Sequence, residues 1–204
     1  MCTSCFKFMN EHHGGAEIEG SMLFADIRGS TALAERTSPA VFRDLLDRFY
    51  ATAGHVVFEH DGYVDKFVGD ELVALFFPLL AGERHALRAV DTAIALLRAT
   101  GHQDPQGPWV PLGAGVHSGR AWFGVLGDRG HPEITAVGDA VNTTARLAAS
   151  AEQGEVLVSA FAAEAAGLDR NLERRILKLK GKEEPFEAVS VRVRRYRRPA
   201  AVSP

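Results

Sequence analysis

The sequence has few cysteines, no basic excess and no long apolar run, and each shortage excludes a class of protein. Among its 204 residues, Cys2 and Cys5 are the two cysteines, which excludes a scaffold held together by disulfides. The formal net charge is −3, whereas general nucleic-acid-binding proteins usually carry a basic excess. The longest apolar run, LVALFFPLLA, spans ten residues including a proline, too short to cross a bilayer. We therefore expect no nucleic-acid partner and no transmembrane segment.

The remaining composition, 46% hydrophobic and 24% charged, is typical of a globular protein of one sizeable domain. The first residues lack the basic start and apolar core of a signal peptide, which predicts a cytoplasmic protein. We expect a flexible tail or linker over residues 1–19, a folded domain over residues 20–194 and a second tail over residues 195–204.

Strand-like and helix-like segments alternate along this domain. The run SMLFADI has the length of a strand, a long helix begins at Ser38-Pro39, and a hairpin surrounds Gly69-Asp70. Further helices are predicted over residues 83–99 and 138–151. Between them we expect two strands, VPLGAGVHSG and RAWFGVLG, and then a loop, GDRGHPEIT. Because helices and hairpins are mixed, an α+β sheet is favoured over a fully parallel α/β sheet.

Two aspartates occupy positions from which they could hold a metal ion. Asp26 ends the first strand and Asp70 lies at the hairpin tip, so both carboxylates could converge at one end of the sheet. Paired carboxylates typically hold Mg²⁺ that also binds substrate phosphates. After Asp26, the segment Arg28-Gly29-Ser30-Thr31 begins a helix whose backbone N–H groups could bind phosphate. Taken alone, such a segment is more often a simple helix cap.

Lys66 sits inside the otherwise apolar hairpin. Side chains alternate along a regular strand, so Lys66 would share a face with Val64 and Val68, while Asp65 and Phe67 would lie on the other face. Lys66 would then project among apolar neighbours near the hairpin tip. Two interpretations stay open: a solvated lysine on an edge strand, or a donor to a base or phosphate.

A second polar pair lies in the segment GDAVNTTARLAAS. Asn142 and Arg146 are four residues apart and therefore share one helical face. Arginine suits phosphate charge, and asparagine suits sugar or phosphate oxygens. An exposed surface pair is the simpler reading, and it would be preferred if this pair were the only signal.

Five segments together resemble the catalytic domain of class III nucleotidyl cyclases, the adenylate and guanylate cyclases. The segments occur in the family's order between Leu23 and about Val193, and they are LFADIRGST, DGYVDKFVGDELVALF, GVHSGRAWFGVLG, AVGDAVNTTARLAA and LKLKG. Each segment alone is modestly specific, whereas all five in order are highly specific. The resemblance implies a ferredoxin-like βαββαβ palm with additional C-terminal strands and helices, and a cyclase catalytic domain over residues 20–194.

The resemblance implies roles for the aspartates and their neighbours. Asp26 and Asp70 would bind two Mg²⁺ or Mn²⁺ ions per active site, and the Ile27 carbonyl would add a further ligand. Lys180 would match a lysine that binds the triphosphate, and Lys182 fits the same motif in another register. The expected reaction converts ATP to 3′,5′-cyclic AMP and pyrophosphate when the ribose 3′-oxygen attacks the α-phosphorus.

The resemblance also covers contacts to the nucleoside. Lys66 matches the lysine that favours adenine, and Thr135 stands where many members have an aspartate as second adenine contact. Asn142 matches the asparagine that orients the ribose, and Arg146 the arginine that stabilises the transition state. Because a hydroxyl can donate as well as accept, Thr135 should reject guanine less strictly than an aspartate would. One threonine-containing subgroup includes bicarbonate-responsive adenylate cyclases, so bicarbonate is a possible effector.

A head-to-tail homodimer is implied as well, because in this family the metal residues of one subunit face the base and transition-state residues of another. Two alternatives stay open. Guanylate cyclase activity is disfavoured by Lys66, and a low-turnover nucleotide-binding regulatory module is disfavoured by the intact Asp26, Asp70, Asn142 and Arg146.

The chain ends carry two further signals. Cys2 and Cys5, with His12 and His13, could be half of a zinc site, and the arginine-rich residues 192–198 could contact acidic lipid or nucleic acid. At the N-terminus we favour a free tail or a remnant of a longer N-terminal module, because the sequence supplies no further cysteines to complete a zinc site. At the C-terminus we favour a solvated tail.

Overall fold

The computed structural model describes residues 14–127, 133–179, 181, 184–194 and 196. The expectations for the cysteine-containing N-terminus, for most of the C-terminal tail and for Lys180 and Lys182 lie outside the described residues. None of the helices within the described ranges combines the length and the apolar character needed to cross a membrane.

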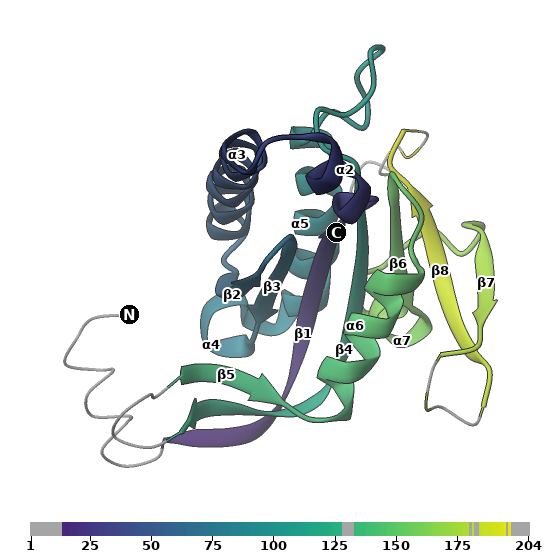
Figure 1. Cartoon of the computed structure of the whole chain (residues 1–204). Helices are drawn as coiled ribbons and strands as arrows, with labels where there is room; N and C mark the ends of the chain where they lie inside the picture. The colour runs from purple at the N-terminus through teal and green to yellow at the C-terminus, as the bar shows by residue number, and fades with distance from the viewer. Residues whose placement is uncertain (1–13, 128–132, 180, 182–183, 195, 197–204) are drawn as a thin grey trace.

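The described residues form one sheet of eight strands in the spatial order β2-β3-β1-β4-β6-β8-β7, and β5 pairs with β4 beside this path (Figure 1). The strand bounds are Gly15–Ile27 for β1, Tyr63–Val68 for β2, Glu71–Phe76 for β3, Leu112–Leu126 for β4, Glu133–Val137 for β5, Glu155–Ser159 for β6, Arg174–Leu177 for β7 and Phe186–Arg192 for β8. The helix bounds are Ser30–Arg36 for α2, Pro39–Glu59 for α3, Pro78–Ala81 for α4, His85–Ala99 for α5, Asp139–Ser150 for α6 and Ala160–Ala165 for α7, with a 3₁₀ turn, η1, at Gly82–Arg84.

The first half of the chain is a βαββαβ unit. β1, α3, β2, β3, α5 and β4 follow one another, and β3 and β4 pair antiparallel with the two sides of β1. β6 then adds in parallel to β4, and β8 and β7 extend the sheet antiparallel. This arrangement confirms the predicted α+β, ferredoxin-like palm with additional C-terminal strands.

Local signals explain where α3 begins and ends. The Ser38 hydroxyl accepts a hydrogen bond from the Val41 N–H at 3.3 Å, and Pro39 occupies the first turn, where its missing N–H costs nothing. The helix ends at Glu59, and the chain reverses through Asp61, whose φ is 60°. The predicted N-cap is therefore confirmed.

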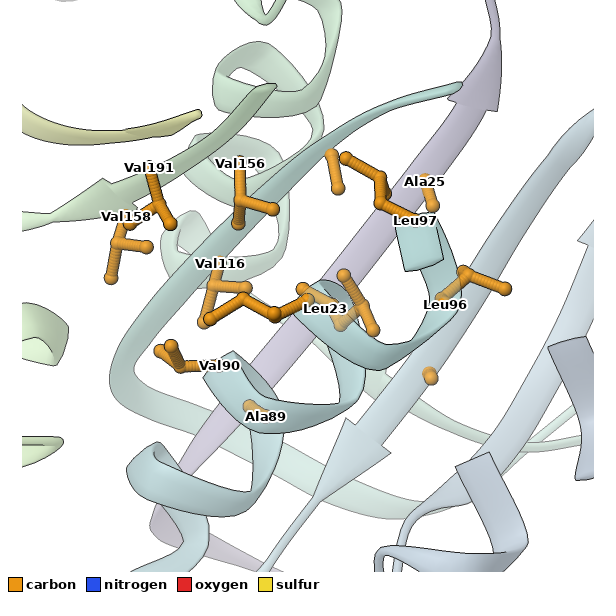
Figure 2. Packing of buried hydrophobic residues seen from close by; sticks show 14 of the residues in the cluster. Leu23, Ala25, Ala89, Val90, Leu96, Leu97, Val116, Val156, Val158 and Val191 are labelled. Atoms are coloured by element: carbon orange, nitrogen blue, oxygen red, sulfur yellow. The ribbon is translucent and has the colours of Figure 1, made fainter. Parts of the chain in front are cut away.

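The two faces of the sheet are covered unequally. α3, α5 and α7 pack on one face in the larger core, where Val90 and Leu97 of α5 contact strand residues such as Leu23 and Val116 (Figure 2). Burying a side chain of this size stabilises the fold by about 2 kcal/mol. On the other face, α6 packs over a smaller cluster that contains Met22, Phe24, Val73 and Leu75. The site residues of the hairpin and of α6 lie on this less covered face.

Two sequence expectations about strands are wrong. The segments VPLGAGVHSG and RAWFGVLG form the single strand β4, because Ser118 and Gly119 stand opposite Ser21 and Gly20 in an unbroken ladder with β1. The expected loop GDRGHPEIT ends in β5 from Glu133 onward. β5 pairs along its whole length with the C-terminal part of β4, and this long-range pairing is invisible to local pattern.

The N-terminal boundary also differs from the prediction. β1 begins at Gly15, so residues 15–19 belong to the sheet and not to a tail. The backbones approach closely here, because a Cβ on Gly15 would lie 2.3 Å from the Trp122 ring. Glycine at this position lets β1 run beside β4, a use that its polar neighbours Glu17 and Glu19 conceal in the sequence.

Candidate active site

Asp26 and Asp70 lie side by side at one end of the sheet. Asp26 stands opposite Glu71 in the β1–β3 ladder, and the Ile27 N–H donates to the Asp70 carbonyl at 3.3 Å. Burial raises the pKa of Asp26 to about 6; the nearby Arg28 opposes this rise and the Asp70 carboxyl adds to it. The structure thus brings together the two carboxylates that the sequence placed at one sheet end.

This donor set fits a divalent cation. Two neighbouring carboxylates repel each other when both are charged, and the raised pKa of Asp26 reflects that cost together with burial. Carboxylate and carbonyl oxygens are the ligands that Mg²⁺ and Mn²⁺ prefer, with substrate phosphates completing the coordination. Within the described ranges no group of three or more His, Cys, Asp or Glu side chains is arranged to hold a metal ion.

Tyr50 of α3 holds the turn that carries Asp70. Its hydroxyl donates to the Gly69 carbonyl, and its ring stacks on Phe67 with centroids 3.9 Å apart. Gly69 has a φ of 61°, a left-handed conformation that glycine adopts without steric cost. Sequence reasoning missed Tyr50, because a tyrosine in an apolar helical pattern looks like any other core residue.

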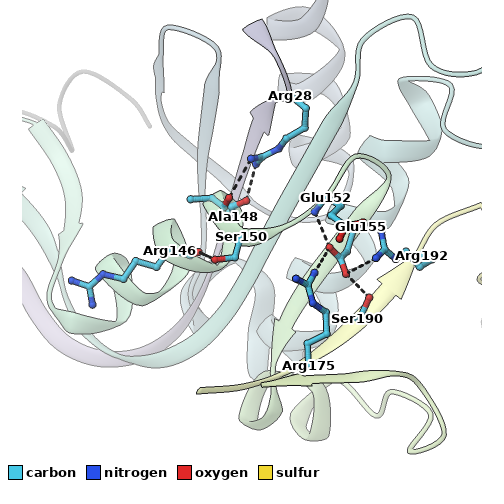
Figure 3. Close-up of polar contacts among 10 residues, drawn as sticks. Arg28, Arg146, Ala148, Ser150, Glu152, Glu155, Arg175, Ser190 and Arg192 are labelled. Carbon is cyan, nitrogen blue, oxygen red and sulfur yellow. Dashed lines mark hydrogen bonds and ion pairs between the residues drawn. The ribbon is translucent and has the colours of Figure 1, made fainter. Parts of the chain in front are cut away.

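The segment after Asp26 is divided between two tasks. Gly29, with a φ of 72°, precedes α2, and Ser30 and Thr31 line a shallow pocket together with Asp70. Arg28 instead extends to the C-terminal end of α6, where it donates to the Ala148 carbonyl at 2.7 Å (Figure 3). It also lies 3.5 Å from Asp26. Arg28 therefore joins the end of β1 to α6, and its expected part in substrate binding stays a prediction.

Lys66 and Val64 lie on opposite faces of β2, although they were expected to share one face. The register between β2 and β3 shifts between Val64 and Lys66, which marks a β-bulge at Asp65. Val64 and Phe67 pack against the larger core, whereas Lys66 pairs with Val73 of the smaller cluster. The predicted sharing of a face by Val64 and Lys66 is wrong, because one extra residue breaks the two-residue period.

The bulge brings Lys66 and Thr135 to the same carboxylate. The Thr135 hydroxyl on β5 donates to Asp65 Oδ2 at 2.9 Å, and Lys66 Nζ lies 4.0 Å from that oxygen. Lys66 also donates to the exposed Glu133 at 2.8 Å, and this bond raises the pKa of Lys66. Sequence reasoning missed Asp65 and Glu133. Asp65 could have been found by its position beside Lys66, had it not been assigned to the other face.

Asn142 and Arg146 share one face of α6, as predicted. Asn142 is exposed and Arg146 is half-buried. The Arg146 side chain extends away from the contacts that Arg28 makes at the end of this helix (Figure 3). Its guanidinium lies beside the backbone of Gly181, since a Cβ there would be 3.3 Å from Nη2. The LKLKG segment thus passes close to Arg146, while its Lys180 lies outside the described residues.

Two cavities in the described structure lie away from the predicted site residues. One, of about 740 Å³, is lined by α7 and the segment after it, including Phe161 and Arg170. The other, of about 510 Å³, lies between the loop around Gly107 and the end of β8. No predicted site residue lines either cavity. The predicted residues are instead arranged in two partly exposed groups, one around Asp26 and Asp70 and one around Lys66, Thr135 and α6.

Comparison with known proteins places the chain in a family. The sequence profile of the adenylate and guanylate cyclase catalytic domain matches residues 17–188. The chain is 31% identical over 180 residues to the terminal-differentiation-specific adenylate cyclase of Dictyostelium discoideum, which covers 84% of this chain and 8% of that protein. Its fold matches the guanylyl cyclase Cya2 with a TM-score of 0.79 and 27% identity, covering 87% of this chain and 93% of the other.

A further fold match is the adenylyl cyclase CyaB from P. aeruginosa, with a TM-score of 0.76, 24% identity and coverage of 87% and 96%. The chain spans between 8% and 36% of the length of the curated relatives it matches. The profile covers most of the chain. The paired aspartates, Asp26 and Asp70, and the α6 residues Asn142 and Arg146 follow one another in the order that the family resemblance implies. The chain therefore belongs to the adenylate and guanylate cyclase catalytic domain family.

Proposed function

We propose that this domain is an adenylate cyclase that converts ATP to 3′,5′-cyclic AMP and pyrophosphate. The observation that carries the proposal is the meeting of Lys66 and Thr135 at Asp65. A lysine can donate to N1 of adenine, which accepts, and a hydroxyl oxygen can accept from the 6-amino group. The named relatives include both adenylate and guanylyl cyclases, so we argue the choice of purine from these residues.

The group of residues around Asp26 and Asp70 would bind the metal ions and the triphosphate. Asp26, Asp70 and the Ile27 carbonyl would hold two Mg²⁺ or Mn²⁺ ions, which when bound lower the pKa of the ribose 3′-hydroxyl and neutralise the phosphates. Ser30 and Thr31 lie in the pocket beside Asp70, where backbone N–H groups at the start of α2 can reach phosphate oxygens.

The α6 residues Asn142 and Arg146 would act on the ribose and on the negative charge that develops on the leaving pyrophosphate. Asn142 would orient the ribose so that its 3′-oxygen lies in line with the α-phosphorus. Arg146 would stabilise the negative charge that builds up as the bond to pyrophosphate breaks, and Lys180 would bind the triphosphate. Phosphoryl transfer of this kind depends on positioning and charge stabilisation and requires no covalent nucleophile.

A head-to-tail homodimer would combine the two groups into two equivalent sites. Apolar residues next to both groups support this proposal. Val68 lies two residues before Asp70 and is 57% exposed, and Val137 lies beside the start of α6 and is 40% exposed. A second copy of the chain would cover such residues.

Product identification tests the proposal. Purified protein is incubated with ATP or GTP and with Mg²⁺ or Mn²⁺, and the cyclic product is identified by chromatography and mass spectrometry, with Asp70→Ala protein as inactive control. We expect cyclic AMP as the main product. Mainly cyclic GMP would instead indicate a guanylate cyclase, and no cyclic product with either metal would indicate a regulatory nucleotide-binding module. Bicarbonate against matched chloride tests the effector response.

A further inference from the structure

Asp65 is a buried acid that neither the metal pair nor the proposed chemistry uses. Its side chain is 5% exposed, although it lies on an edge strand beside an exposed lysine. The β-bulge directs it toward β5, where its Oδ2 accepts the Thr135 hydroxyl hydrogen at 2.9 Å. Thr135 is also buried, at 6% exposure. Because both side chains are buried, this hydrogen bond satisfies polar atoms that have little access to solvent.

The hydrogen bond determines what the Thr135 oxygen can still do. A threonine hydroxyl has one hydrogen and two lone pairs, and an ionised carboxylate has no hydrogen to donate. While Asp65 is ionised, the Thr135 hydrogen points at Asp65, and the oxygen is left with lone pairs. Burial has the largest effect and raises the pKa of Asp65 above its ordinary value, and the nearby Glu133 adds to this rise, while the Thr135 hydrogen bond and Lys66 oppose it.

We propose that Asp65 is a positioning residue that fixes Thr135 as a hydrogen-bond acceptor and so makes the site select adenine over guanine. The inference rests on the proposed function, in which Lys66 and Thr135 face the purine. The 6-amino group of adenine donates to such an acceptor. The 6-oxo group of guanine is itself an acceptor, so two lone pairs would meet. Thr135 held in this way discriminates as an aspartate would, against the expectation for a freely rotating hydroxyl.

The variant Asp65→Asn tests the proposal directly. Its side-chain amide can donate to the Thr135 oxygen, which releases the hydroxyl hydrogen to donate to guanine. We expect the preference for ATP over GTP to fall about tenfold or more, since mispaired buried polar groups carry penalties of this size. The preference is measured as the ratio of dissociation constants for 3′-deoxy-ATP and 3′-deoxy-GTP, which lack the attacking oxygen, and as the ratio of kcat/KM values. A ratio within twofold of wild type would overturn the proposal.

Two further variants separate this effect from charge and from structure. Glu133→Gln removes the other acid beside Lys66 but leaves the Thr135 contact intact, so its ATP-to-GTP ratio should stay at the wild-type value. An equal fall in that variant would show that the charge around Lys66, and not Thr135, sets selectivity. In a Thr135→Val background, Asp65→Asn should cause no further change in the ATP-to-GTP ratio. A further change would show that Asp65 does not act through Thr135.

Binding of the two 3′-deoxy analogues also distinguishes a failure of this inference from a failure of the proposed function. A wild-type protein that prefers 3′-deoxy-ATP but forms no cyclic product would contradict the proposed catalysis, and the Asp65 variants would still decide this inference. A wild-type protein without preference for 3′-deoxy-ATP would overturn the inference itself. If thermal unfolding shows that Asp65→Asn does not fold, Asp65→Ala replaces it, because removal of the carboxylate likewise releases the Thr135 hydroxyl hydrogen to donate to guanine.

Discussion

Two arginines near α6 serve different purposes. Arg28 donates through its two terminal nitrogens to the carbonyls of Ala148 and Ala149, and so ties β1 to the end of α6 (Figure 3). Arg146 projects from the same helix in another direction, and no ion pair or hydrogen bond within the described residues engages its guanidinium. Residue type alone cannot separate these roles, whereas the contacts of each guanidinium can.

Arg146→Lys should lower kcat about 100-fold with little change in KM or in the midpoint of thermal unfolding. The ammonium keeps the charge but loses the planar fork that matches phosphate oxygens as charge develops. Steady-state kinetics and thermal unfolding of the purified variant measure these effects. Arg28→Lys is the matched control and should mainly lower the unfolding midpoint. A near wild-type kcat in Arg146→Lys would contradict the assigned role.

At the scale of elements, the β2–β3 hairpin depends on α3. The Tyr50 hydroxyl and ring hold the turn at Gly69 and Phe67, and Asp70 follows directly. The position of Asp70 relative to Asp26 therefore depends in part on α3, a helix that carries neither carboxylate. A fixed ligand distance matters because Mg²⁺ demands near-ideal coordination geometry.

Tyr50→Phe should raise the concentration of Mg²⁺ needed for half-maximal activity several-fold and destabilise the protein by about 1 kcal/mol. The ring still stacks on Phe67, but the hydrogen bond that holds the turn is lost. A metal titration of activity and urea unfolding measure the two effects. Tyr196→Phe removes a hydroxyl from a buried tyrosine outside the site and should leave the metal dependence unchanged. Equal shifts in both variants would refute the positioning role of Tyr50.

The C-terminal strands are joined by a buried acid. Glu155 of β6 is fully buried and accepts from Arg175 at 2.7 Å and from the Ser190 hydroxyl at 2.5 Å (Figure 3). Burial alone would raise its pKa, but the Glu152 N–H and these two side chains outweigh burial, so the pKa is lowered below 4.5. Folding therefore favours the charged form of this carboxyl.

Glu155→Gln should lower the free energy of unfolding by about 2 kcal/mol at pH 7. A group with a lowered folded pKa contributes stability above its unfolded pKa, here about 4.5, and this contribution is lost as the pH falls through the lower folded value. The difference between wild type and variant should thus shrink below pH 4.5 in urea titrations. Glu187→Gln, which breaks an exposed pair with Arg174, should cost less than about 1 kcal/mol. A pH-independent difference would contradict the linkage.

At the scale of the whole molecule, the site residues form two groups. Asp26 and Asp70 form one group at the end of β1, while Lys66, Thr135 and the α6 residues form the other. The proposed homodimer would place the first group of one chain against the second group of its partner. Each chain would then supply half of both sites.

Mixing two inactive variants tests the shared sites. Asp70→Ala and Asn142→Ala proteins should each be inactive alone, and their mixture should regain up to about a quarter to a half of wild-type activity, because a mixed dimer has one intact site. Activity is measured after co-refolding or co-expression, with heterodimers quantified by differential tags. Mixing Asp26→Ala with Asp70→Ala protein is the control and should restore nothing. No recovery in the first mixture, with heterodimers present, would refute shared sites.

Much of the fold was predictable from local pattern. Helical spacing and the Ser38-Pro39 start predicted α3, and the Gly69-Asp70 turn between apolar runs predicted the β2–β3 hairpin. The convergence of Asp26 and Asp70 followed from strand order, because a helix between them returns the chain to the same end of the sheet. These features depend on neighbours close in sequence or on simple topology.

The sequence by itself thus determined the α+β palm, the candidate metal pair and the Asn142-Arg146 face, since each rests on local spacing and on family motifs. The tertiary structure alone decided that β5 exists, that Arg28 binds the end of α6 and that Asp65 meets Thr135. Each of these depends on a partner far away along the chain. A bulge of one residue reverses the face of every later side chain in a strand, and only pairing with a neighbouring strand can reveal it.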